Sequence, residues 1–180
     1  MWLLAVISVA CFACPSAPAA APELHDGTHD FDWDIGTWKV HSRRLLHPLT
    51  GSTTWVDYEG TDVVRQIWGG RANLGEVELD GPSGHLEYVT LRLYNPTTQR
   101  WSMNISSSAA GVLSPPAIGS FSAGQAEFYD QEEYQGRNIL VRIKVSVLTP
   151  TTCRFEQSFS EDFGKSWEVN LIVNETRTGS

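Results

Sequence analysis

The sequence is poor in cysteine, which limits how the fold can be stabilised. Only 3 of its 180 residues are cysteine, and two of them, Cys11 and Cys14, stand near the start of the chain. If that start is removed as a signal peptide, Cys153 is the only thiol and no intramolecular disulfide can form. Cys153 has no histidine nearby in sequence, so we interpret it as a buried small side chain and not as a nucleophile. A hydrophobic fraction of 41% is enough to build the core of one domain of this length.

Basic charge is scarce as well. The chain holds 13 Lys and Arg residues against 21 Asp and Glu residues, which gives a formal net charge of -8. Proteins bind nucleic acid largely by neutralising its phosphates with basic side chains. The composition therefore predicts that nucleic acid is not a partner.

Charged side chains are absent from the first stretch, MWLLAVISVACFACPSAPAAAP. An apolar run over residues 2–13, followed by small residues and proline, is typical of a secretory signal peptide. The run is shorter than the roughly 20 residues that span a bilayer, so no membrane insertion is expected after cleavage. We expect a secreted or periplasmic protein, and lipid attachment at Cys11 or Cys14 is the alternative. The expected division is a signal peptide at 1–21, a polar linker at 22–30 and one domain at 31–180.

Long helices are also not expected: the sequence shows no helical pattern of ten or more residues after residue 36. Instead, Val, Ile, Thr, Trp, Tyr and Phe alternate with polar residues, which predicts strands. The expected strands are 37–46, 53–59, 61–68, 73–79, 85–94, 100–107, 118–122, 125–130, 138–148, 151–160 and 166–174. Closure of such a meander into a barrel removes its exposed edges. The acidic residues at 130–133, with Glu127, are interpreted as a solvated turn, and a catalytic carboxylate pair is the alternative.

The segment FDWDIGTWKV, at residues 31–40, precedes and begins the first expected strand. Lipocalin-like barrels are similar in this feature: one helical turn closes the barrel floor and a Trp, here Trp38, points inward. In such folds an Arg from the far end of the chain lies over that Trp, and Arg177 is the matching residue. An Arg stacked on Trp contributes about 0.5 to 2 kcal/mol. The resemblance implies a structural role for this pair.

Several motifs in one order extend the resemblance to the whole domain. These are FDWDIGTW, LRLYNPTTQRW, PPAIGSF, AEFYDQEEYQGR and SEDFGKSWEVNLIVNETR. Together they resemble a family of exported bacterial proteins of unknown function with a lipocalin-like, or calycin-like, barrel and the opening motif FDxxIGxW. The resemblance implies an all-β fold, an antiparallel lipocalin-like β-barrel of about 8–10 strands with a short N-terminal helical turn. It implies no reaction.

The stretch SEDFGKSW, at residues 160–167, fits the S-x-D-x-G-x-x-W pattern of sialidase blades. Each of its marked residues also serves a turn: Asp162 accepts backbone hydrogen bonds, Gly164 supplies a positive φ angle and Trp167 packs beneath. Sialidases repeat the pattern in several blades, whereas it occurs once here. We therefore interpret these three residues as structural.

The hairpin around Asn95-Pro96-Thr97-Thr98 indicates which side chains enter the barrel. With Pro96 at the second turn position, Arg92 would stand opposite Trp101, Thr90 opposite Met103 and Tyr88 opposite Ile105. Period-two alternation places these side chains on one face, which we expect to be the barrel interior. Arg142 is a second candidate for an inward cation, and a place on the outer surface is the alternative for it. Trp68 is expected to line the mouth. The predicted ligand-binding residues are Tyr88, Arg92, Trp101, Met103, Ile105, Trp68 and Arg142.

Such an interior suits a small hydrophobic or amphipathic molecule, with an anionic or carbonyl end held by Arg92. The alternatives are an enzyme that uses the same cavity for isomerisation, cyclisation or hydrolysis, and a barrel whose core is filled.

No metal and no cofactor are predicted. The stretch HDGTHDFDWD, at 25–34, carries groups that bind divalent ions, but polar linkers have the same composition. His41, His47 and His85 lack the spacing of metal ligands. A haem ligand among these three is an open alternative, because a related class of barrels holds haem through one His.

Overall fold

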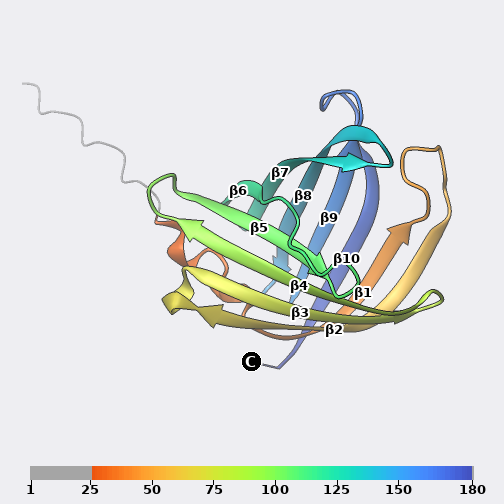
Figure 1. Ribbon diagram of the computed structural model, residues 1–180. Coiled ribbons are helices and arrows are strands. Elements are labelled where there is room, and N and C mark those ends of the chain that lie inside the picture. The colour runs from red at the N-terminus through yellow and green to blue at the C-terminus, as the bar shows by residue number, and fades with distance from the viewer. Residues whose placement is uncertain (1–25, 180) are drawn as a thin grey trace, which may run out of the picture.

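The computed structural model describes residues 26–179, and these residues form a closed, ten-stranded antiparallel barrel (Figure 1). Each strand pairs with the next in sequence, and the first pairs with the last. The strands are β1 (Gly36–Leu45), β2 (Trp55–Ile67), β3 (Ala72–Gly81), β4 (Gly84–Asn95), β5 (Arg100–Ser107), β6 (Ala117–Ser122), β7 (Gln125–Tyr134), β8 (Arg137–Thr149), β9 (Thr152–Ser160) and β10 (Glu168–Gly179). The helical segments are the 3-10 turns η1 (Gly27–His29), η2 (Asp32–Asp34) and η3 (Trp68–Gly70). The predicted all-β barrel with a short helical turn before it is confirmed.

Two details differ from the expected strands. The expected strands 53–59 and 61–68 are one continuous strand, β2, which passes through Gly60. A Cβ at Gly60 would lie 1.8 Å from the carbonyl oxygen of Glu78, so this glycine marks a close backbone approach and not a turn. The acidic residues at 130–133 are also not a turn, because they lie within β7 and alternate between the two faces of that strand.

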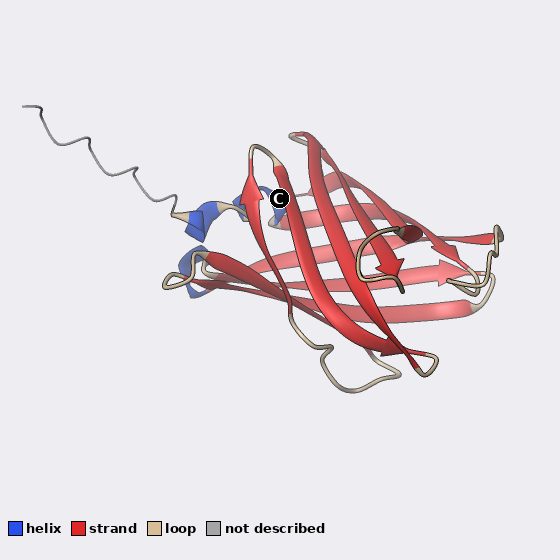
Figure 2. Ribbon diagram, turned by 90° about the horizontal axis from the view of Figure 1, so that it is seen from above, coloured by secondary structure: helices blue, strands red, loops and turns tan. Residues whose placement is uncertain are grey.

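The helical turns gather at one end of the barrel, which we call the floor (Figure 2). The chain passes directly from η2 into β1, and a Cβ at Gly70 of η3 would lie 3.3 Å from the carbonyl oxygen of Thr28 in η1. The other end, where β3 turns into β4 and β7 turns into β8, is called the mouth. No helix in the described range is both long and apolar enough to cross a membrane.

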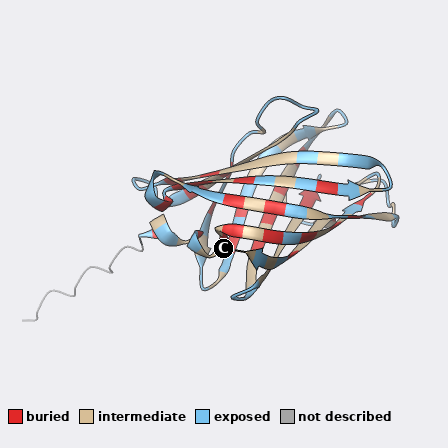
Figure 3. Ribbon diagram, turned by 90° about the horizontal axis from the view of Figure 1, so that it is seen from below, coloured by how far each residue is buried: buried red, intermediate tan, exposed pale blue. Residues whose placement is uncertain are grey.

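The core fills the floor and one side of the barrel. Phe31, before η2, packs against Trp101 and Phe121 with ring centroids 5.0 and 5.5 Å apart. Buried residues alternate with less buried ones along the strands, as Figure 3 shows. On β8, for example, Ile139 and Val141 are buried on the inner face. The rest of the interior is less completely filled, and it holds a cavity lined by residues from every strand except β6.

The predicted signal peptide at 1–21 lies outside the described residues. Of the expected linker at 22–30, residues 27–29 form η1, and Gly27 is buried. The backbone N–H of Gly27 donates to the Tyr94 hydroxyl at 3.0 Å, and its carbonyl accepts from the Trp101 indole at 3.1 Å. This part of the expected linker therefore belongs to the barrel floor.

Candidate functional site

The barrel interior contains a cavity of about 290 Å³. It extends from Arg92 and Glu175, near the floor, to Arg44, Pro48 and Tyr134, near the mouth. Its wall is mainly apolar. The apolar and aromatic lining residues are Val40, Leu45, Pro48, Tyr58, Val77, Leu79, Leu86, Tyr88, Met103, Ile105, Tyr134, Ile143, Phe155, Phe159, Leu171 and Val173.

The deep end of the cavity is built around Arg92 on β4. Its Nη1 donates to Asp34 Oδ2 at 2.6 Å and to Asn73 Oδ1 at 3.1 Å. Asp34 is completely buried, and Arg92 is 2% exposed. The guanidinium also lies 5.1 Å from the ring centroid of Phe31 and 5.5 Å from that of Phe155. Arg92 is therefore fixed by an ion pair, an amide and two aromatic rings.

Three buried carboxyl groups surround this single guanidinium. They belong to Asp34 at the end of η2, Asp62 on β2 and Glu175 on β10. In the barrel, β1 lies between β2 and β10. Burial raises the pKa of Asp34, raises that of Asp62 to about 7 and raises that of Glu175 to about 8, although Arg92 opposes each increase. At neutral pH the site therefore contains carboxyl groups that can either accept or donate a hydrogen bond.

Several polar atoms at this end have no hydrogen-bond partner. They include Asp34 Oδ1 and, on residues that line the cavity, Oδ1 of Asp62, Oγ1 of Thr90 and Nε of Arg92. A Cβ at Gly75 would lie 2.6 Å from Thr90 Oγ1 and 3.0 Å from Asp62 Oδ1, so the glycine makes room for both groups. Buried polar atoms are rarely left unpaired, and a cavity beside them indicates a place for a polar ligand group or water.

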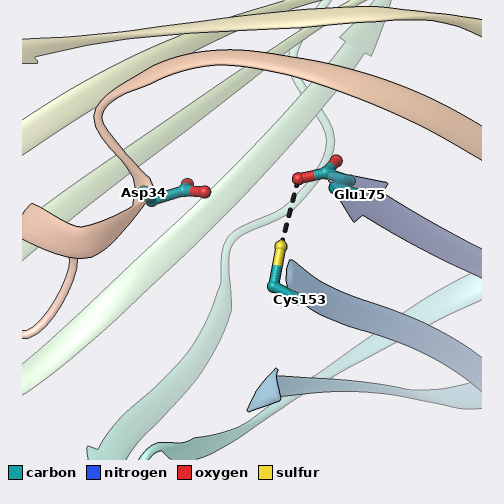
Figure 4. Close-up of side chains that lie close together, drawn as sticks. All are labelled: Asp34, Cys153 and Glu175. Carbon is teal, nitrogen blue, oxygen red and sulfur yellow. Dashed lines mark hydrogen bonds between the residues drawn. The ribbon is translucent and has the colours of Figure 1, made fainter. Parts of the chain in front are cut away.

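Asp34, Cys153 and Glu175 present three potential metal-ligating atoms within 4.8 Å of one another (Figure 4). All three side chains have a partner within the protein, although Asp34 Oδ1 itself has no hydrogen bond. Asp34 pairs with Arg92, and the Cys153 thiol donates to Glu175 Oε2 at 3.3 Å. Burial raises the pKa of this thiol, whereas a metal binds the thiolate. We therefore assign no metal to this cluster.

Four of the predicted ligand-binding residues line the cavity, namely Tyr88, Arg92, Met103 and Ile105. Trp101 does not, because it packs into the floor, where its indole bonds to Gly27. The expectation for Trp68 at the mouth is wrong. Trp68 is 66% exposed in η3, at the floor end.

Arg142 also requires correction, because its side chain points outward from β8. It alternates with the inward-facing Val141 and Ile143, and its guanidinium lies 4.3 Å from the ring centroid of Trp167 on the outside of the barrel. Tyr129 stands opposite Arg142 on β7, and its ring centroid lies 6.1 Å from that of Trp167. Arg142 therefore belongs to an outer aromatic cluster.

The β4–β5 hairpin has a different register from the expected one. Arg92 stands opposite Met103 and Tyr94 opposite Trp101. The loop contains four residues, 96–99, because Asn95 pairs with Arg100, and Gln99 takes a positive φ of 53°. The shift is two residues, so the same side chains still share the inner face.

The predicted structural residues lie as follows. The Arg177 guanidinium is 4.2 Å from the ring centroid of Trp38, which is 1% exposed, and donates to the carbonyl oxygens of Ile35 and Trp33. In the β9–β10 turn, Asp162 Oδ1 accepts from Ser166 N at 2.9 Å, and the Trp167 indole donates to the Gly164 carbonyl at 3.1 Å. Gly164 has a φ of 83°.

Sequence reasoning did not identify Asp62 and Glu175. A usable signal existed in the alternation, because Asp62 has the same parity as the buried Tyr58 and Val64, and Glu175 the same parity as Val173. An acidic residue at an inward position of an otherwise apolar strand indicates an interior polar site.

None of the three open histidine candidates lines the cavity. His41 contacts Asp57 at 3.1 Å and His85 contacts Asp80 at 2.9 Å, both with exposed side chains, and His47 lies exposed in the β1–β2 connection. This geometry offers no interior haem ligand among them.

No family model matches this chain, and no curated protein matches it. The expected family membership therefore stays a prediction. Among solved structures, the chain is similar to the crystal structure of Rv2717c from M. tuberculosis, with a TM-score of 0.57 and 8% identity over 87% of this chain and 99% of that chain. This likeness shows a shared fold.

Two further solved structures are EF1p2_mFAP2b bound to DFHBI and the redesigned beta barrel mFAP0 bound to DFHBI. Their TM-scores are 0.46 and 0.44 at 10% and 12% identity. The alignments cover 84% and 81% of this chain, and 98% and 99% of those chains. At these TM-scores the likeness says nothing about what this chain binds.

Proposed function

We propose that this protein binds a small hydrophobic or amphipathic molecule inside the barrel. The observation that carries the proposal is the cavity of about 290 Å³, with an apolar wall and a few polar groups at its deep end. Ligand sites in proteins have this composition, and their volumes begin near 300 Å³, so the ligand is small. The sequence expectation of an anionic or carbonyl end at Arg92 is one form of this proposal. Export to the periplasm or beyond belongs to the proposal too, and its support is the signal-peptide pattern.

A second candidate function is an enzyme that uses the same cavity for isomerisation, cyclisation or hydrolysis. The observation that favours it is Asp62, a cavity-lining carboxyl group whose pKa burial raises to about 7. A carboxyl group with a pKa near the working pH is suited to transfer protons as a general acid or base. In this case the protein would convert the bound molecule, and mass spectrometry would detect a product.

The binding proposal is tested with a neutral fluorescent probe, N-phenyl-1-naphthylamine, and a pair of matched variants. Val77 lines the cavity on β3, whereas Val63 lies on the outer face of the neighbouring strand β2. We expect saturable binding to the wild type, an affinity lower by roughly tenfold or more for Val77→Trp, and no change for Val63→Trp. Circular dichroism checks that both variants fold. Absence of saturable binding to the wild type, or equal effects of the two variants, would rule out binding in the cavity.

A further inference from the structure

We propose that the ligand carries a protonated amine at its polar end and that Asp62, with Thr90 beside it, binds this amine at the deep end of the cavity. This inference rests on the proposed function and adds the chemical class of the ligand's polar end. It is the alternative to the anionic or carbonyl end that the sequence suggested for Arg92.

The charges at the deep end favour a cation. Among residues 26–179, Arg92 is the one cationic side chain that lines the deep end of the cavity, and it forms its ion pair with Asp34, whose pKa Arg177 also lowers. Asp62 and Glu175 have no salt bridge in the described structure. A ligand carboxylate would be the fourth acidic group around one guanidinium. Two like charges about 4 Å apart repel by about 4 kcal/mol at an effective dielectric constant of about 20, so a buried anion is disfavoured.

The unpartnered oxygen atoms fit an ammonium group. Asp62 Oδ1 and Thr90 Oγ1 are both buried, line the cavity and lack a hydrogen-bond partner. Both face the space above Gly75, where a Cβ would come within 3.0 Å of each or closer. An ammonium group has three donors and no acceptor, so it can serve both oxygen atoms at once. A carboxylate could accept only from the Thr90 hydroxyl and finds no donor on Asp62 when Asp62 is ionised.

The apolar wall fits the other part of the ligand. From the deep end towards the mouth, the lining is aliphatic and aromatic, including Leu79, Ile105 and Phe155. Burial of an alkyl chain there contributes roughly 0.8 kcal/mol for each methylene group. An alkylamine of moderate length therefore combines the two halves of the site.

The pH dependence follows from the groups that face Asp62. Burial is the main cause of its pKa of about 7, Arg92 lowers that pKa, and Asp34 and Glu76 raise it, while Glu175 lies on the same wall. A bound ammonium favours the ionised carboxylate. Affinity for an alkylamine should therefore rise as the pH increases through about 7 and stay high while the amine remains protonated.

The test is a displacement assay at pH 8 on the full chain. It compares the affinities of four competitors, decylamine, decanol, decanoate and 2-undecanone, from their displacement of N-phenyl-1-naphthylamine. We expect decylamine to bind roughly tenfold or more tightly than decanoate, with decanol and the ketone between them. Asp62→Asn should reduce the affinity for decylamine to that for decanol and leave decanol unchanged. The control, Asp57→Asn, alters an exposed carboxylate of the same strand and should change neither affinity.

Equal or tighter binding of decanoate or the ketone would overturn the amine proposal, and so would a preference for decylamine that survives Asp62→Asn. If Asp62→Asn fails to fold, the wild type decides the question: affinity for decylamine that does not change between pH 6 and pH 8.5 counts against the proposal. Probe binding without an amine preference refutes only this inference. Absence of probe binding refutes the proposed function itself.

Discussion

At the scale of single residues, the pair of Arg92 and Asp34 governs the deep end of the barrel. Both side chains are almost fully buried, and neither charge can be hydrated if the other is removed. The inward direction of Arg92 was predictable from the alternation of β4. Its partner was not, because Asp34 belongs to an acidic segment before the first strand, and only the packing of η2 against the floor brings it to Arg92.

Removal of the guanidinium should be costly. Arg92→Met leaves Asp34 buried without its ion pair, and the loss of one partner of a buried pair typically costs about 3 to 5 kcal/mol. The matched control is Arg65→Met, whose pair with Glu76 is exposed and should contribute less than about 1 kcal/mol. Urea unfolding at pH 7 measures both free energies. Equal losses for the two variants would mean that the buried pair does not stabilise the fold.

Arg142 shows a second lesson at this scale. Its neighbours Val141 and Ile143 both face inward, so strict alternation already placed Arg142 outside. The sequence did contain this information, although the charge of Arg142 suggested a pocket role. Trp68 differs, because no periodic pattern could place the residues of η3 at the floor or at the mouth.

At the scale of elements, the sequence predicted strands better than their register. The β4–β5 hairpin is shifted by two residues from the expected pairing, and a shift of two keeps every side chain on its own face. The hydrophobic pattern therefore cannot distinguish the expected register from the observed one. The loop conformation was also hidden, because its residue of positive φ is Gln99 and not a glycine.

In the β9–β10 turn, substitutions at two neighbouring positions should change the stability of the protein in opposite directions. Phe163 and Gly164 both have positive φ angles, 61° and 83°, and Phe163 is 91% exposed. Gly164→Ala should destabilise the protein by about 1 to 2 kcal/mol, since a Cβ there would make only an ordinary contact, 3.5 Å from the Trp167 ring, and the backbone alone is strained. Phe163→Gly relieves the same strain at the neighbouring position and should be neutral or stabilising. Thermal unfolding compares the two, and a stabilising effect of Gly164→Ala would contradict the assigned turn.

At the scale of the whole molecule, the sequence indicated a closed barrel but not whether it is hollow. The volume of the interior depends on which side chains meet across ten strands, and this requires every register to be known. The aromatic residues Phe31, Phe121 and Phe128 fill one part, while Gly75 leaves space in another. The cavity volume is the small difference between the volume enclosed by the barrel and the volume of the side chains inside it, and composition alone does not give this difference.

The buried carboxyl groups predict how the stability of the whole molecule depends on pH. In the unfolded chain, Asp and Glu have pKa values of about 3.9 and 4.3. In the folded protein those of Asp62 and Glu175 rise to about 7 and about 8, and that of Asp34 is raised as well. Between these values the folded state binds more protons than the unfolded state. Stability should therefore be highest near pH 4 to 5, fall as the pH rises to about 8, and level off above that.

Urea unfolding at pH 5 and at pH 8.5 measures this difference, which we expect to be about 1 kcal/mol or more in favour of pH 5. The double variant Asp62→Asn/Glu175→Gln removes two of the titrating groups and should flatten the profile. A wild-type stability that rises between pH 5 and pH 8.5 would show that these carboxyl groups are ionised in the folded protein throughout.

The pairing of β1 with β10 has a consequence for how the chain folds. Thr37 stands opposite Gly179, so the last contacts to be joined are separated by almost the whole length of the domain. The nine pairings between successive strands from β1 to β10 can form locally, but the sheet stays open until β1 and β10 pair. Such distant pairing is slow, because the chain loses the entropy of closing a long loop before the stabilising contacts form. We infer that ring closure is the rate-limiting step of folding, and that an interior able to hold a guest exists only after the C-terminal strand has docked.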